Sequence, residues 1–171
     1  MKLGQLSIRA RVAYAATCLE LLLKKKFSSN KKEEEAWDFL LEKIWTYTQI
    51  NPGTWHYTMA ELTPFSIEED LSFAEKSFDD LTYENYILLS EAYKNTAEDV
   101  KKIVDLIFEI GTLDLYTSIV NNSPRTQEML KEILLIVKAN GLDIPDLANY
   151  KRLTIDENEG WGRIFKKSDL G

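Results

Sequence analysis

The sequence has only one cysteine and one histidine among its 171 residues. Cys18 has no internal partner for a disulfide, so we expect a reducing, cytoplasmic location. Tetrahedral zinc sites need several Cys or His ligands, which this chain lacks. His56 also lacks the Glu-x-x-His spacing that builds di-iron sites in helical bundles. The sequence therefore predicts neither a zinc site nor a di-iron site.

Long apolar runs and glycine-rich loops are missing as well. No stretch approaches the roughly 18 apolar residues of a membrane-spanning helix. Arg9 and Arg11 before the segment VAYAATCL resemble the start of a signal peptide, but Glu20 interrupts the apolar run and the spacing is that of an amphipathic helix. There is no phosphate-binding loop and no nucleophile-elbow motif. We therefore expect no enzymatic activity, no cofactor and no association with membranes.

The strongest helical signal lies in TAEDVKKIVDLIFEIGTLDLYTSIV, residues 96–120. Val100, Ile103 and Ile107 belong to an apolar stripe with helical spacing, and Thr96 is a suitable N-cap. Gly111 is the point at which this helix would kink or split. Because the segment is apolar on most of its circumference, we expect other helices to surround it.

Apolar spacing and capping residues predict further helices along the chain. They are expected at 7–26, 32–48, 54–63 (short and aromatic), 66–78, 82–95, 123–139 and 145–153 (short). Ser66, followed by Glu69 three residues later, matches a capping box at the start of the 66–78 helix.

The fold class follows from these helices and their connections. No window alternates with the period of a strand. The short connections favour antiparallel neighbours. We predict an all-α, single-domain bundle of six to eight mostly antiparallel helices, with solenoid-like stacking left open. Residues 1–155 would form the helical domain. Residues 156–171 would form an irregular tail that is packed on this domain or trails from it.

Charge is distributed unevenly along the chain, whose net charge is −7. Residues 1–32 carry eight Lys or Arg and one Glu, a net charge of +7. Residues 33–120 carry five Lys and nineteen Asp or Glu, a net charge of −14. Some of these acids stand in first turns of helices, where the helix dipole explains them. The remaining excess repels nucleic acid and attracts basic proteins.

The acidic middle of the chain also contains the residues that we expect to bind a partner. Aromatic residues are enriched in the cores of interfaces, and the acids would steer a basic partner. The predicted binding residues are Trp55, Tyr57, Glu68, Glu69, Asp70, Asp79, Asp80 and Glu84. For Trp55 and Tyr57, the competing interpretation is that they close the core at the end of the bundle.

In general character the chain resembles the small immunity proteins of bacterial polymorphic-toxin and contact-dependent inhibition systems. The resemblance is carried by the acidic helical segments EEEAWDFLLEKIW and FSIEEDLSFAEKSFDDL and by the C-terminal GWGRIF. It implies a cytoplasmic protein that binds one cognate toxin domain and blocks its active site or docking surface. No functional residue is transferred by this resemblance.

Two alternatives remain at this point. One is a helical scaffold or regulatory module that forms a homodimer through the first helix or the tail, in which Lys24, Lys25 and Lys26 would pair with the acidic surface. The other is an enzyme with a metal site made of carboxylates alone, which would place several acids with raised pKa values in a cleft.

Overall fold

The structure is a computed structural model that describes residues 2–26 and 30–170. Within these residues the chain forms eight α-helices and four short 3-10 turns, with no β-strand. The α-helices are α1 (Ile8–Lys26), α2 (Lys31–Thr46), α3 (Pro52–Ala60), α4 (Pro64–Glu68), α5 (Phe73–Lys76), α6 (Tyr83–Asn95), α7 (Glu98–Thr112) and α8 (Pro124–Ala139). The prediction of an all-α bundle is confirmed.

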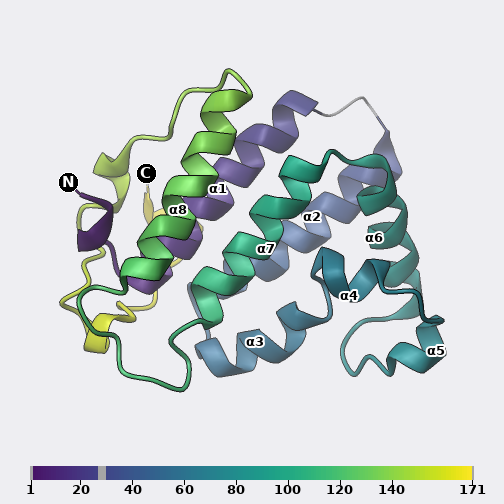
Figure 1. The fold of residues 1–171 in the computed structure, drawn as a ribbon, viewed down its shortest axis with the longest axis horizontal. Coiled ribbons are helices and arrows are strands. Elements are labelled where there is room, and N and C mark those ends of the chain that lie inside the picture. The colour runs from purple at the N-terminus through teal and green to yellow at the C-terminus, as the bar shows by residue number, and fades with distance from the viewer. Residues whose placement is uncertain (1, 27–29, 171) are drawn as a thin grey trace.

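The long helices form two layers, which Figure 1 shows face on. Helices α7 and α8 lie in front of α1 and α2, and α6 closes the end of the bundle beside α2. Helices α3 and α4 pack against α7 and extend along one edge. None of the helices described in this structure is both long enough and apolar enough to cross a membrane.

Helix α1 is the most enclosed element, with thirteen of its nineteen residues buried. It packs against α2, α7 and α8. Its alanines at positions 10, 13, 15 and 16 are all buried, and such small side chains allow neighbouring helices to approach closely. Most of the apolar residues of α1 are therefore covered within the molecule.

Helix α7 is shorter than the sequence indicates, because it ends at Thr112 rather than near Val120. Its N-cap is Ala97, not Thr96. Beyond the helix the chain turns, and the Ser123 hydroxyl donates to the Asp114 carboxylate over 2.6 Å. This bond ties the turn to the start of α8. The helix thus ends one residue after Gly111, the position at which the sequence indicates a kink or split.

The prediction of one helix over 66–78 is wrong, since α4 and α5 are separate. Thr63 caps α4, with Pro64 at its first position, and the real capping box joins Ser72 to Glu75 at the start of α5. A proline at the first helical position is favourable because its missing N–H needs no partner there. The chain therefore starts a helix before Ser66 and starts another after Leu71.

The last residues return to the start of α1. Leu6 forms an isolated antiparallel bridge with Thr154, and the backbone N–H of Arg9 donates to the carbonyl of Trp161 over 3.1 Å. Further along, the N–H of Phe165 donates to the carbonyl of Thr48 over 3.0 Å, and the Phe165 side chain is buried. These contacts hold the segment from 154 to 165 against the bundle.

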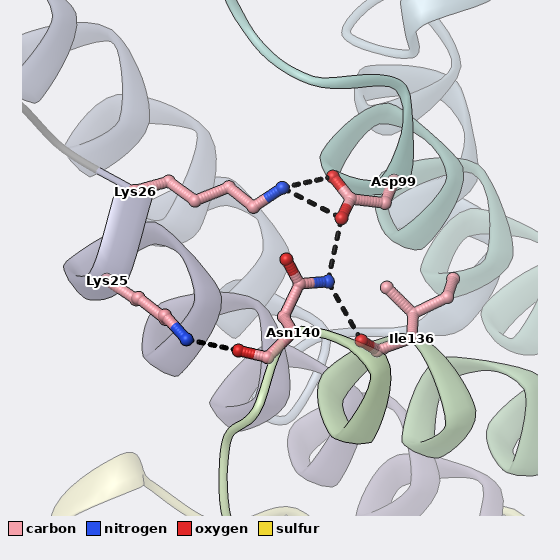
Figure 2. A network of polar contacts seen from close by, with 5 residues as sticks. All are labelled: Lys25, Lys26, Asp99, Ile136 and Asn140. Atoms are coloured by element: carbon pink, nitrogen blue, oxygen red, sulfur yellow. Dashed lines mark hydrogen bonds and ion pairs between the residues drawn. The ribbon is translucent and has the colours of Figure 1, made fainter.

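A polar clasp joins the ends of three helices (Figure 2). The ammonium of Lys26, at the end of α1, contacts both carboxylate oxygens of Asp99 in the first turn of α7. The Asn140 amide donates to Asp99 over 2.7 Å and to the Ile136 carbonyl over 2.9 Å, and Lys25 donates to the Asn140 carbonyl. The clasp therefore fixes α1, α7 and α8 relative to one another.

Candidate partner-binding surface

Most of the predicted binding residues lie in one segment, residues 61–84, which we call the acidic corner. It contains α4, α5 and the first residues of α6, and it carries eight carboxylates and one lysine. In Figure 1 it occupies the end of the molecule where α4, α5 and α6 meet. The corner is therefore a continuous stretch of chain with a large excess of negative charge.

Polar contacts to the backbone hold the corner in shape. The Glu61 carboxylate accepts hydrogen bonds from the backbone N–H groups of Asp79, Asp80 and Leu81 over 2.6–3.0 Å. The Lys76 ammonium donates to the carbonyls of Ser66 and Glu69 at the end of α4, over 2.8 and 2.7 Å. Glu61 and Lys76 thus serve structural roles, as Glu75 does in the capping box of α5.

The structure exposes all six acids that the sequence singles out, including Glu68. Glu69 and Asp70 follow α4, Asp79 and Asp80 precede α6, and Glu84 lies in the first turn of α6; all five are exposed. Asp80 also accepts a hydrogen bond from Thr58 of α3 over 2.7 Å. This bond connects α3 to the corner.

Glu68 differs from the other acids because it has a fixed cation partner. Its carboxylate lies 2.6 Å from the ammonium of Lys101 on α7, and the Lys101 side chain is only 13% exposed. Glu98 is a second partner of Lys101, over 3.1 Å. The Glu68 charge is therefore largely committed to holding α4 against α7.

The two predicted aromatic residues lie on opposite sides of α3. Tyr57 is 68% exposed, whereas Trp55 is 1% exposed. The Trp55 indole packs edge-on against Tyr47 and donates its N–H to the carbonyl of Lys43 over 2.9 Å. Trp55 therefore closes the core, as in the competing interpretation, and does not belong to the exposed surface.

His56 is a packed member of the same aromatic group. Its ring stacks on Phe108 with ring centroids 5.7 Å apart, and it lies against Tyr57 at 5.4 Å. Among the described residues, no group of three or more His, Cys, Asp or Glu side chains is arranged to hold a metal ion. The Cys18 thiol is buried, and its burial raises its pKa to about 12.

Sequence reasoning missed the apolar residues that the corner exposes. Phe65 is 78% exposed, Tyr83 is 62% exposed and Leu71 is 42% exposed. Leu71 lies in the break between α4 and α5, not in a continuous helix over 66–78. Pro64 is the sequence signal that could have identified Phe65, because a helix that starts at Pro64 carries Phe65 in its first turn.

A small aromatic cluster supports these exposed side chains. The Phe73 ring contacts the rings of Phe78, Tyr83 and Tyr86 at centroid distances of 5.2–5.8 Å. Phe73, Phe78 and Tyr86 are only partly buried. Tyr83 is therefore held in place by the cluster while most of its surface faces solvent, which is a suitable arrangement for an interface anchor.

The positive charge of the N-terminal segment does not balance the acidic corner. Arg11 is fully buried and donates to the carbonyl of Ser123 and the hydroxyl of Thr126, while Arg9 is 5% exposed and donates to the carbonyls of Tyr47 and Ile50. Burial lowers the pKa of Arg11 to about 10. Much of the cationic charge in residues 1–32 is thus used inside the molecule or in the clasp.

One further carboxylate beside the corner has a perturbed pKa. The pKa of Asp105 on α7 is raised to about 6: burial is the largest cause, repulsion from Glu109 and Glu68 adds to it, and Lys102 opposes it. Raised carboxylate pKa values mark functional sites and also strained packing of like charges. Here the geometry is that of neighbouring acids on and beside one helix.

Comparisons of the chain with protein-family profiles, with curated proteins and with solved structures found no match.

Proposed function

We propose that the protein is a binding inhibitor that neutralises a cognate basic toxin domain of bacterial origin, acting in the cytoplasm and without catalysis. The observation that carries this proposal is the acidic corner itself. It combines exposed carboxylates with the exposed side chains of Phe65 and Tyr83. Complementary charge accelerates the encounter of two proteins, and buried aromatic anchors supply most of the lasting affinity.

The geometry supports a division of labour within the corner. Asp70 and Glu84 are exposed acids at the ends of α4 and α6, where they would lie at the rim of an interface. Phe65 and Tyr83, with Tyr57 on α3, would lie nearer its centre. A partner with a basic surface would meet a segment in which Lys76, the one lysine, is turned onto backbone carbonyls.

The test begins with capture of the partner from a lysate of the source bacterium at low salt. Three immobilised baits are compared: the natural protein, the corner variant Asp70→Lys with Glu84→Lys, and a control variant Glu128→Lys with Asp143→Lys. The control changes two exposed acids outside the corner, so both variants have the same net charge. We expect one basic protein on the natural and control baits, and its loss from the corner variant.

The captured protein is then expressed in a bacterial host. The proposal predicts that it arrests growth by itself and that co-expression of this protein restores growth. A captured protein that leaves growth unchanged would contradict the proposal. So would equal capture of the partner by the natural bait and by the corner variant.

A further inference from the structure

A second surface feature is a hollow whose lining residues lie outside the acidic corner. It is an open groove of about 570 Å³ between α1 and α2, with Lys167 of the C-terminal segment at its margin. From α2 it is lined by residues at positions 34, 37, 38, 41, 42 and 45, which form a single stripe on one helix face. Such a stripe extends about 16 Å along the helix axis.

The floor of this α1–α2 groove is apolar and closed. Trp37 is 1% exposed, Leu23 3% and Trp45 8%, so their side chains form a packed base. Leu41 is partly buried along the same stripe. An occupant of the groove would therefore bring apolar groups against Leu41 and the exposed part of Trp45, above the buried Trp37.

The rim of the groove is mainly acidic. Glu34, Asp38 and Glu42 stand along α2 and are all exposed, and Lys24 is the cation on the α1 side. In a helix these three acids are spaced four residues apart, so they form a row of negative charge beside the apolar floor. This row is complementary to a segment that carries several positive charges.

Lys167, a cation of the chain itself, already binds to an aromatic ring and a carboxylate at the margin of the groove. The Lys167 ammonium lies 4.9 Å from the centroid of the Trp45 ring and forms an ion pair with Glu20. The Trp45 indole N–H donates to the same Glu20 carboxylate over 2.7 Å. Trp45 and Glu20 therefore form a fixed aromatic and anionic pair, which is the arrangement that binds an ammonium or guanidinium group.

From this geometry we propose that the α1–α2 groove docks a cationic segment of another polypeptide, one that combines Lys or Arg side chains with apolar ones. The positive side chains pair with the acidic row of α2, and the apolar side chains rest on Leu41 and Trp45. Recognition of an amphipathic segment in a groove between helices follows the same principle. This proposal uses no residue of the acidic corner, so it does not depend on the proposed function.

The test is a titration of the isotope-labelled, full-length protein with the capped peptide KLLKKLLK, followed by amide and indole NMR signals. Two peptides serve as comparisons: KSSKKSSK keeps the charge without the apolar side chains, and ELLEELLE reverses the charge. We expect KLLKKLLK to shift the signals of α2, of residues 20–24 and of the Trp45 indole, with weaker binding by KSSKKSSK and none by ELLEELLE.

Matched variants assign the binding to the groove. Asp38→Asn with Glu42→Gln should raise the dissociation constant of KLLKKLLK by about threefold or more, because exposed charge pairs each contribute modestly. Glu33→Gln with Glu35→Gln removes the same charge from the same helix outside the groove and should leave the constant unchanged. Circular dichroism checks that each variant is folded.

Three results would overturn the proposal. The first is a titration in which KLLKKLLK shifts only the NMR signals of the acidic corner. The second is equal binding of KLLKKLLK and KSSKKSSK, which would show that net charge alone explains the binding of these peptides. The third is an equal loss of affinity in both double variants.

Discussion

The ammonium of Lys26 lies 2.7 and 2.8 Å from the two carboxylate oxygens of Asp99, so the last residue of α1 is tied to the first turn of α7. Partial burial of Asp99 raises its pKa, but hydrogen bonds from Lys26 and Asn140 outweigh this effect and place the pKa below its usual range. The relationship matters beyond stability, because it engages a cation that could otherwise reach the acidic surface of a second copy.

Asp99→Ala should lower the free energy of unfolding by about 1–2 kcal/mol at neutral pH, because it removes an ion pair and an amide partner that are both partly buried. A depressed carboxylate pKa contributes stability above the unfolded pKa and loses it as the pH falls through the folded pKa. Denaturant unfolding should therefore show a smaller difference between variant and natural protein at pH 3 than at pH 7. Equal differences at both pH values would show that charge on Asp99 is not the cause.

Asp105→Asn should have the opposite effect and stabilise the protein. Because the folded pKa of Asp105 is raised to about 6, the folded state binds more protons than the unfolded state between about pH 4 and pH 6, and stability falls as the pH rises through this window. The variant should gain about 1 kcal/mol at pH 7.5, after allowance for solvent screening, and nothing near pH 4. Thermal unfolding at the two pH values measures this, and a variant that is less stable at pH 7.5 would contradict it.

Gly111→Ala should destabilise the protein although alanine favours helices. A Cβ atom at this position would lie 2.8 Å from the Trp55 ring and 3.1 Å from the Tyr47 ring, and overpacking of this kind costs about 1–3 kcal/mol. Trp55→Phe combined with Gly111→Ala should recover part of the loss, because it makes room for the added methyl group. Denaturant unfolding of both single variants and the double variant would detect this coupling, and strict additivity would count against the contact.

Part of the fold could be predicted from the sequence. Helices α1, α2 and α8 begin within about two residues of their predicted starts, because apolar stripes and N-terminal signals coincide there. For helix α7, Gly111 indicated where the 96–120 helix would kink or split, and the helix ends one residue later, at Thr112. The apolar pattern does not reveal the turn that follows, in which Ser123 bonds to Asp114.

The candidate surface was predictable only in part, for a related reason. Charge is visible in the sequence, and acids such as Asp70 and Glu84 were expected on the surface, where they lie. Whether an aromatic side chain points into the core or to solvent depends on the elements packed around it. Trp55 and Tyr57 are two positions apart, yet one packs against Tyr47 in the core and the other faces solvent. The exposure of Phe65 depends on where α4 begins.

Phe65→Ala should separate binding from stability. Because the side chain is 78% exposed, its loss should change the free energy of unfolding by less than about 0.5 kcal/mol. If Phe65 is an anchor at the centre of the interface, the dissociation constant for the captured partner should rise about tenfold or more, mainly through faster dissociation. Tyr116→Ala is the matched control, since Tyr116 is 83% exposed and lies outside the corner. An equal effect of both substitutions on binding would remove Phe65 from the interface.

The central claim is that the acidic corner steers a basic partner to the protein, and association kinetics test it most directly. The rate constant for the captured partner is measured at low and high salt with the natural protein, with Asp70→Lys and Glu84→Lys together, and with the control Glu128→Lys and Asp143→Lys. We predict that the corner variant associates about tenfold or more slowly at low salt, that high salt narrows the difference, and that the control is much closer to the natural protein. Equal rate constants for the two variants at low salt would contradict the account.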